Sequence, residues 1–375
     1  MSTAAALPIL QWRSTTRRAS NRHRAVRQET NVTSTPWHDL LGLINGFQIT
    51  QAIRVAATLR IADHLKDGPR PAKELAFLTQ SNPDALYRLL RALAAVGVFR
   101  EDEGRSFALT PMGDCLREDS ATPIGGWAEH VGSPAYWQAW GHLLHSVRTG
   151  DNAFRSLHGM DVWEYRSRHP EANSLFNRAM SDMSKGGSEA VVNVYDFSSF
   201  SRIVDVGGGH GSLLAAILRD SPRAHGTLFD QPQVVAGAGA RLRELGVIDR
   251  CNIVGGSFFD AVPEGGDAYI LRHIIHDWED GEAIAILQSC RRAMQNSAKL
   301  LLIERTVAPP NQLPGKFSDL NMLVAPGGRE RTGDEYAALL AGSGFELMRV
   351  LPAGSFSVIE ARPRRASFAT GEPGG

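Results

Sequence analysis

Residues 202–211 read RIVDVGGGHG, and this stretch decides the fold. A short apolar run, RIVDV, is followed at once by Gly207, Gly209 and Gly211. Glycine reaches positive φ and lets a ligand approach the backbone, so the pattern is typical of a strand, a tight turn and a helix. A dinucleotide fingerprint would have its third glycine where Ser212 stands. The turn alone therefore leaves a cofactor site and a purely structural turn both open.

Further short apolar runs follow this turn and alternate with helical stretches. Four of them lie at residues 225–230, 251–256, 268–273 and 299–304. With the first run they predict a parallel, doubly wound sheet of the α/β class. Two more runs, at 346–352 and 356–363, lie close together, so we expect a hairpin-like pair at one edge.

Ligands of such sheets bind beyond the carboxyl ends of the strands, and several polar residues fall there. They are Gly207 to Gly211, Asp230, Ser257, Arg272 to Trp278, and Glu304. Asp230 ends the second run roughly 20 residues after the turn, where a carboxylate accepts the ribose hydroxyls of an adenosine cofactor. The plainer alternative is that Asp230 caps a helix starting near Pro232.

His276 lies in LRHIIHDWEDGE, residues 271–282, and is the candidate general base. A neutral imidazole, with a reference pKa near 6.5, can take a proton from an attacking phenol, whose pKa is about 10. Such catalysis contributes roughly 10² to 10⁴ in rate. A lone histidine after a strand more often packs or faces solvent, so its place on the rim carries the argument.

Glu304 and Glu330 are candidates for holding the far nitrogen of His276 and stabilising its protonated form. Salt bridges are the alternative for either carboxylate, because Arg329 and Arg331 flank Glu330. A metal site of His273, His276 and Asp277 lacks a further ligand cluster, so no metal is predicted.

The N-terminal half reads as helices followed by a hairpin at 98–110, the order of a winged helix. The helix over residues 82–96 carries only Arg88 and Arg91 as cations. Because phosphate neutralisation needs a stripe of basic residues, the helix favours packing on another subunit over DNA binding. A winged-helix transcriptional regulator stays a remote alternative.

An apolar stripe of Phe176, Met180 and Met183 precedes the sheet, and Met322 follows late in the chain. Aromatic and thioether side chains build adaptable pockets for flat ligands, although such stripes are more often plain core. Phe176, Met180 and Met322 are the predicted substrate contacts.

The composition limits the remaining possibilities. Forty basic and forty acidic residues cancel, so no overall basic charge indicates nucleic acid, and no apolar run suits a membrane span. Three scattered cysteines, Cys115, Cys251 and Cys290, fit a reducing cytoplasm. The arginine-rich first 33 residues read as a disordered basic tail, a transit peptide or a start codon placed too far upstream.

Together these residues resemble the S-adenosylmethionine-dependent O-methyltransferases of the plant caffeate/hydroxyindole type, in their bacterial secondary-metabolite branch. The resemblance covers about residues 35–362 and rests on VDVGGGHG, LRHIIHDWED, LLIERTV and PGGRERTGDEYAALLAGSGF. It implies S-adenosylmethionine as cofactor, a Rossmann-like methyltransferase sheet, a winged-helix homodimerisation domain, and a small, phenolic or polyketide acceptor. It also implies His276 as base, Glu304 and Glu330 as supports, and cofactor contacts at Gly207, Gly209, Gly211, Asp230, Ser257, Phe258 and Arg272.

One departure concerns Ser257, which stands where the family usually has an aspartate near the adenine amine. Serine supplies no charge, so either cofactor affinity is lower or Asp260 substitutes. The alternatives within the same fold are methylation of nitrogen and cofactor-assisted hydroxylation or decarboxylation.

The expected domain division follows from these segments. A winged-helix dimerisation domain is predicted over residues 34–118, a helical linker and substrate-pocket segment over 119–185, and the cofactor-binding catalytic domain over 186–363. Disordered tails are predicted at 1–33 and 364–375.

Overall fold

The computed structural model describes residues 35–364, without the side chains of residues 184–186. The predicted tails therefore lie outside the described residues, apart from Arg364. Helix α1 (Pro36–Ile44) belongs to a separate unit that ends at Gly46. None of its side chains is buried in this chain, and Leu43 and Ile44 are 75% and 60% exposed.

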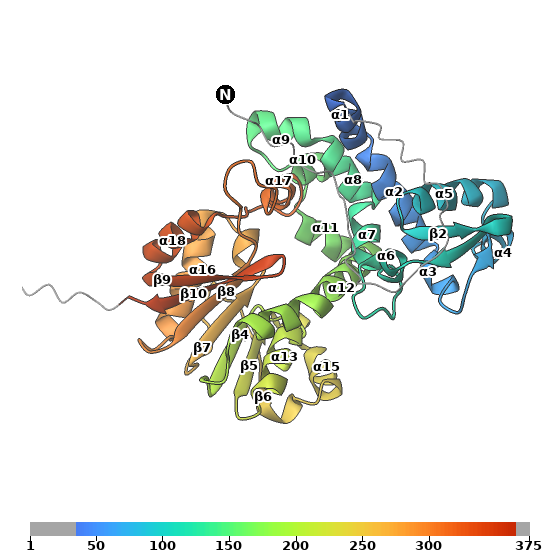
Figure 1. Ribbon diagram of the computed structural model, residues 1–375. Helices are drawn as coiled ribbons and strands as arrows, with labels where there is room; N and C mark the ends of the chain where they lie inside the picture. The colour runs from blue at the N-terminus through green and yellow to red at the C-terminus, as the bar shows by residue number, and fades with distance from the viewer. Residues whose placement is uncertain (1–34, 365–375) are drawn as a thin grey trace, which may run out of the picture. The chain divides into compact units, whose positions relative to one another are not determined.

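The second unit, Phe47–Gly375, begins with the predicted helices and hairpin (Figure 1). Asn82 caps α5 (Pro83–Ala95) by accepting hydrogen bonds from the backbone N–H groups of Asp84 and Ala85 at 3.1 and 3.0 Å. Strands β2 (Phe99–Asp102) and β3 (Ser106–Leu109) pair antiparallel, which confirms the hairpin. The other elements here are α2 (Gly46–Thr58), α3 (Ile61–His64), β1 (Arg70–Pro71), α4 (Ala72–Leu78), η1 (Glu103–Arg105) and α6 (Pro111–Asp114).

Strand β1 was not predicted, because two residues carry no alternating pattern. It pairs with β3 and gives a three-stranded sheet in the order β1-β3-β2. The winged-helix prediction is thus confirmed, with one strand added.

A helical segment follows the small sheet and ends in the long helix α12 (Pro170–Val194). This helix packs against α7 (Gly125–Val131) and α13 (Ser212–Asp220). Close packing on α7 depends on Gly126, whose N–H donates to the Asp182 carboxylate at 2.8 Å. A Cβ at Gly126 would lie only 2.8 Å from the same oxygen. The helices before α12 are α7 (Gly125–Val131), α8 (Pro134–Gly141), α9 (Leu143–Thr149), α10 (Ala153–His158) and α11 (Val162–Arg168).

The large sheet has seven strands in the order β6-β5-β4-β7-β8-β10-β9 (Figure 1). Its five parallel strands are β4 (Arg202–Val206), β5 (His225–Asp230), β6 (Cys251–Gly255), β7 (Ala268–Arg272) and β8 (Lys299–Glu304). The last two strands, β9 (Phe345–Ala353) and β10 (Phe356–Pro363), form an antiparallel pair at one edge. Both the doubly wound sheet and its edge hairpin are therefore confirmed.

Helices cover both faces of this sheet and bury two separate cores. On one face α12, α13 (Ser212–Asp220) and α15 (Ala238–Glu244) contribute Val191, Leu214 and Leu242. On the other, α16 (Asp280–Ala293) and α18 (Gly333–Gly342) contribute Ile286 and Leu340. The remaining elements are α14 (Pro232–Val235), η2 (Ile248–Arg250), η3 (Ile275–Asp277) and α17 (Lys316–Val324).

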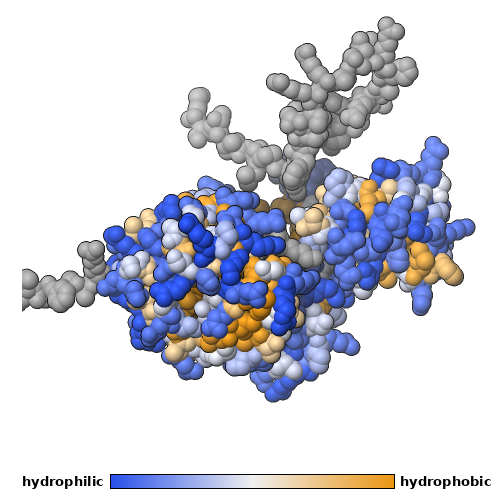
Figure 2. Space-filling model, turned by 90° about the horizontal axis from the view of Figure 1, so that it is seen from below, coloured by the Kyte–Doolittle hydropathy of each residue, from blue (hydrophilic) through white to orange (hydrophobic). Residues whose placement is uncertain are grey.

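The surface of the described part is largely hydrophilic in the view of Figure 2, and the broadest orange hydrophobic area lies in the part that holds the large sheet. Within residues 35–364, no helix combines the length and the apolar character that crossing a bilayer requires.

Candidate functional site

The glycine turn after β4 has the conformation that only glycine takes at low cost. Gly207, Gly209 and Gly211 have φ values of 71°, 59° and 79°. A Cβ at Gly207 would lie 2.5 Å from the Ile274 side chain, whereas one at Gly209 would meet nothing within 4 Å. The turn is thus packed against the sheet at Gly207 and open at Gly209, where a ligand could approach the backbone.

Asp230 links the end of β5 to this turn. One carboxylate oxygen accepts a hydrogen bond from the Gly209 N–H at 2.8 Å, and the other accepts from the Gln231 N–H at 2.6 Å. The cap position of α14 belongs to Gln231, not to Asp230. Because each carboxylate oxygen has two lone pairs, both can still accept a ligand hydroxyl.

Sequence reasoning missed Asp205, which lies inside β4 directly below the glycine turn. Its side chain is 1% exposed, and neither oxygen has a hydrogen-bond partner among the described residues. Burial raises the pKa of Asp205 to about 7, against the nearby positive charge of Arg272. The signal lay within the motif itself, as an acid in an otherwise apolar strand.

Arg272, at the end of β7, reaches α12 and donates to the Ser188 hydroxyl at 2.8 Å. Its Nη2 atom is buried without a hydrogen-bond partner in the described part of the chain. Asp205 and Arg272 therefore present unsatisfied polar atoms of opposite charge beside the turn, a donor set that could hold a zwitterionic amino-acid group.

Ser257 and Phe258 follow the carboxyl end of β6. The Ser257 hydroxyl accepts from the Phe259 N–H at 3.2 Å. The Phe258 ring lies edge-on to that of Trp278, with 6.0 Å between the ring centres, and near Gly207. Ser257 and Phe258 are thus on the same rim as the glycine turn, as the sequence predicted.

His276 lies in η3, beyond β7, within reach of three carboxylates. Its Nδ1 is 3.3 Å from Glu330 Oε1, with hydrogen-bond geometry, and 3.7 Å from Glu304 Oε2. On the other side of the ring, Nε2 is 3.6 Å from the Asp277 carboxylate. Both predicted supports are therefore brought to the same ring nitrogen, and Asp277 is an addition.

The two supporting carboxylates are fixed in different ways. Glu304 Oε1 accepts from the backbone N–H groups of Ile274 and Ile275, at 3.0 and 2.8 Å, so it ties β8 to the loop that carries the histidine. Glu330 Oε1 accepts from the Ser318 hydroxyl at 2.6 Å. Glu304 is thus mainly committed to the backbone, whereas Glu330 faces the imidazole.

The arginines beside Glu330 do not pair with it. Arg331 is 1% exposed and donates to the carbonyls of Ile275 and Trp278, at 3.0 and 2.9 Å, and to Asp280. Arg329 pairs with Glu279 instead. The salt-bridge alternative for Glu330 is therefore wrong, and Arg331 holds the histidine loop by its backbone.

The electrostatics of His276 correct the expectation of an ordinary imidazole. Burial lowers its pKa, but Glu304, Asp277 and Glu330 outweigh this and raise the pKa to about 10. For the carboxyl group of Glu304, burial has the opposite effect and raises the pKa to about 7. His276 and Glu304 therefore both bind a proton more tightly than their reference pKa values indicate.

The same atoms could also hold a cation. One ligand atom each from His276, Glu304 and Glu330 lie within 4.8 Å of one another. His273, which the alternative metal site would use, is partly buried, with its ring against that of Phe356. The absence of a metal stays a prediction.

The predicted substrate contacts lie on α12 and α17. The Phe176 ring is 5.5 Å from that of His130 and 6.1 Å from that of Trp163, and Met180 follows one helical turn later. Met322 is 3% exposed on α17, the helix that also carries Ser318. Sequence reasoning missed Asn321 on this helix, which accepts a hydrogen bond from the Tyr136 hydroxyl of α8.

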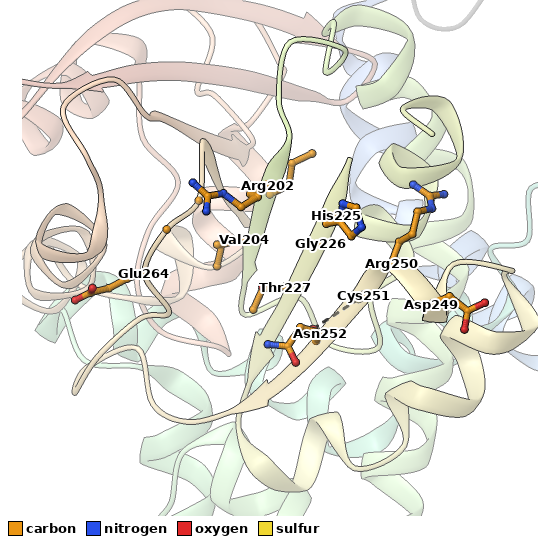
Figure 3. Close-up of a pocket in the computed structure, with 13 residues that line it drawn as sticks. Arg202, Val204, His225, Gly226, Thr227, Asp249, Arg250, Cys251, Asn252 and Glu264 are labelled. Atoms are coloured by element: carbon orange, nitrogen blue, oxygen red, sulfur yellow. Dashed lines mark hydrogen bonds between the residues drawn. The ribbon is translucent and has the colours of Figure 1, made fainter. Parts of the chain in front are cut away.

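A separate hollow of about 430 Å³ lies at the amino ends of β4, β5 and β6 (Figure 3). Arg202, His225 and Cys251 begin these strands and line it. The glycine turn and Asp230 follow the carboxyl ends of the same strands, so this hollow is not the candidate site.

Comparisons with known proteins decide the family. A family model for the O-methyltransferase domain matches residues 140–346, and one for the O-methyltransferase dimerisation domain matches residues 41–119. Phenazine O-methyltransferase PhzM of Lysobacter antibioticus is 47% identical over 86% of this chain and 95% of that protein. The chain belongs to the O-methyltransferase family.

Solved structures of similar proteins agree with this assignment. The crystal structure of LaPhzM has a TM-score of 0.82 and 46% identity, covering 88% of this chain and all of that one. The O-methyltransferase NcsB1 from neocarzinostatin biosynthesis, solved with S-adenosylmethionine and 2-hydroxy-5-methyl naphthoic acid, has a TM-score of 0.71 and 35% identity over 84% of this chain and 96% of that one. This family member is accordingly an S-adenosylmethionine-dependent O-methyltransferase, and its dimerisation domain supports a homodimer.

Relatives with other reactions also match this O-methyltransferase. The 8-amino-8-demethylriboflavin N,N-dimethyltransferase of Streptomyces davaonensis is 37% identical over 84% of the chain and 92% of that protein. Aclacinomycin 10-hydroxylase RdmB of Streptomyces purpurascens is 34% identical over 86% of the chain and 89% of that protein. Methylation of nitrogen and hydroxylation, the alternatives that the sequence left open, therefore both occur among its relatives.

Proposed function

We propose that this O-methyltransferase methylates a hydroxyl group of a small aromatic secondary metabolite, with His276 as the general base. The observation that carries the proposal is the position of His276. It lies on the rim that bears the glycine turn, and Glu330 and Glu304 face one ring nitrogen while Nε2 faces away from them. Relatives that act on a phenazine and bind a naphthoic acid support an aromatic acceptor.

The cofactor would be held by Gly207, Gly209, Gly211, Asp230, Ser257, Phe258 and Arg272, with Asp205 added. The fit is supported by the open backbone at Gly209, the spare lone pairs of Asp230 and the unsatisfied buried atoms of Asp205 and Arg272. When bound there, S-adenosylmethionine supplies an activated methyl group. Ser257 offers the adenine a hydroxyl but no charge.

The acceptor's proton goes to His276 Nε2. Glu330 fixes the ring by its hydrogen bond to Nδ1, and both glutamates stabilise the imidazolium that forms. Phe176, Met180 and Met322 would position the acceptor ring, so that orientation supplies a further part of the rate. The raised pKa of His276 implies that the proton must leave the cluster before the next turnover.

His276→Ala tests the base. We expect kcat to fall roughly 10²- to 10⁴-fold, with cofactor affinity unchanged, because the ring contributes to proton transfer and not to cofactor binding. Asp230→Ala is the matched variant and should weaken cofactor binding, measured by calorimetry. Full turnover by His276→Ala with bound cofactor would overturn the assignment.

Product mass with an isotopically labelled methyl donor separates the alternative reactions. A labelled methyl on oxygen supports the proposal, whereas a labelled methyl on nitrogen, or oxygen insertion without label, supports the reactions of the two divergent relatives. The presence of His276 favours methylation. Retained turnover after chelation of metals would support a reaction that needs no cation at His276, Glu304 and Glu330.

We further propose that the enzyme works in the cytoplasm as a homodimer. The three cysteines are unpaired in the described residues, which suits a reducing compartment. For the division of labour we propose dimerisation by residues 34–118, a substrate-pocket segment over 119–185 and cofactor binding by 186–363. Expression of the last segment alone, with measurement of cofactor binding, tests this division.

A further inference from the structure

Arg166, on α11, is a buried cation with an unsatisfied donor. The residue is 7% exposed, and its Nη1 atom is buried without a hydrogen-bond partner among the residues that the structure describes. Taking a charge out of water is costly unless a partner compensates for it. A buried guanidinium with a free donor therefore indicates a missing anionic partner.

Aromatic rings surround the guanidinium and compensate for part of this cost. Its central carbon lies 3.4 Å from the centre of the Phe176 ring and 5.0 Å from that of Trp163. His130 lies between Phe176 and Tyr136, with ring-centre distances of 5.5 and 4.7 Å. The faces of these rings stabilise the cation, but none of the rings accepts a hydrogen bond from Nη1 among the described residues. The donor requirement of Arg166 is thus still unmet.

Side-chain hydrogen bonds connect this cluster to the histidine end of the site through α17: Tyr136 bonds Asn321, and Ser318 donates to Glu330. The charge of Arg166 acts on Asp277, the neighbour of His276, and on Tyr136, which bonds Asn321 of α17. Burial lowers the pKa of Arg166 to about 10, so it stays positive at neutral pH. No ion pair joins Arg166 to a carboxylate within the described part of the chain, whereas Asp277 lies 3.6 Å from His276 Nε2. Asp277 is therefore already engaged.

We propose that Arg166 binds an ionised carboxylate of the acceptor, so that the preferred substrates are hydroxylated aromatic acids. This inference rests on the proposed function, since it takes His276 as the place where the acceptor hydroxyl lies. A guanidinium matches a carboxylate with two parallel hydrogen bonds, and Phe176 and Trp163 supply flat apolar surface for the attached ring. Burial strengthens this pairing, because little water competes for either charge.

The test compares each acid with its carboxamide, which keeps the shape and removes the charge. The probes are 4-hydroxybenzoate, a hydroxynaphthoate and a hydroxyphenazine carboxylate, each with its amide. Arg166→Met is compared with wild type and with Arg168→Met, a matched control on the same helix whose side chain is 60% exposed and pairs with Glu164. Arg166→Lys restores the charge without the planar fork.

Wild type should favour at least one acid over its amide in kcat/KM. In Arg166→Met this preference should fall roughly 10- to 100-fold, because a charged hydrogen-bonded partner is lost. Arg168→Met should keep the preference, and Arg166→Lys should restore part of it. The proposal is overturned if wild type favours no acid in the panel, or if Arg166→Met lowers turnover of acid and amide equally, as loss of packing or of a charge near Asp277 would.

Calorimetric binding of the same probes, with S-adenosylhomocysteine present, separates this proposal from the proposed function. If acids bind better than amides in an Arg166-dependent way but none is methylated on oxygen, the carboxylate site stands and the reaction assignment fails. If phenols are methylated without any preference for acids, the reaction stands and the role of Arg166 fails.

Discussion

The carboxylates around His276 stabilise the protonated form of its imidazole. Nδ1 faces Glu330 and Glu304, and Nε2 faces Asp277, so an imidazolium is stabilised from both sides. The raised pKa follows from this arrangement. A tightly held proton makes the neutral ring scarce at neutral pH, but it also makes proton uptake from a phenol favourable.

Glu330→Gln should therefore move the acidic limb of the kcat/KM profile to lower pH. Removing one carboxylate removes stabilisation of the imidazolium, so the pKa of His276 falls and the neutral ring is present at lower pH. An opposite charge at this distance shifts a pKa by roughly one to three units. Glu279→Gln, which removes an exposed partner of Arg329, is the control and should leave the limb in place. If the acidic limb of the kcat/KM profile is unchanged in Glu330→Gln, Glu330 is not the main group that stabilises the His276 imidazolium.

Sequence reasoning found the residues of the rim but not all of their partners. Gly207, Asp230 and His276 were predictable because each follows a strand whose end is visible in the apolar pattern. Arg166 and Asn321 were not, because their contacts join α8, α11, α12 and α17, which lie far apart in the chain. The pattern also left open whether Glu330 pairs with arginine or histidine, since only the fold shows that Arg331 turns toward η3.

At the scale of elements, the segment 327–331 holds the histidine loop in place. Arg331 bonds the carbonyls of Ile275 and Trp278, and the Arg329 N–H donates to the His276 carbonyl at 2.9 Å. Gly328 lies so close that a Cβ would come within 2.2 Å of that carbonyl oxygen. Gly328 thus lets one loop pack directly on the backbone of the other.

Gly328→Ala should displace η3 and lower kcat at least tenfold, while leaving cofactor binding unchanged. Gly327→Ala is a sharp control: both glycines have positive φ, 97° and 66°, but a Cβ at Gly327 meets nothing within 4 Å. Backbone strain is common to both variants, and contact with His276 is specific to one. Equal kcat values for the two variants would show that the close approach is unimportant for turnover.

The strands were the most predictable elements, and their order was the least. Buried parallel strands such as β8 read as continuous apolar runs, so their bounds could be predicted within a residue. The order β6-β5-β4-β7-β8 depends on which crossovers pack on which face, which the local pattern does not encode. Strand β1 is too short to carry any pattern.

At the scale of the whole molecule, the exposed apolar helix α1 fits the dimerisation domain. The matched domain begins at residue 41, and Leu43 and Ile44 are among its most exposed apolar side chains. Apolar side chains left exposed on one helix mark an interaction surface. Their burial against a second copy is therefore expected.

Changing Leu43 and Ile44 together to Glu should convert the dimer to a monomer, measured by light scattering during gel filtration. Burying two carboxylates without partners is costly, so the equilibrium shifts toward single chains. Met348→Glu on β9, at an exposed apolar side chain outside the matched dimerisation domain, is the control. An unchanged mass for the double variant would exclude this end of α1 from the interface.

The protonation of His276 and Glu304 also makes the folding stability of the enzyme depend on pH. His276 and Glu304 both have folded pKa values above their unfolded ones, about 10 and about 7 against 6.5 and 4.5. The folded chain thus binds more protons than the unfolded chain, so the cluster's stabilising contribution falls as pH rises from about 5 towards 10. Proton abstraction by His276 improves over the same range. We expect the melting temperature to fall and the turnover rate to rise as the pH increases through the alkaline range. The pH at which the enzyme performs best is therefore set by folding stability and turnover together.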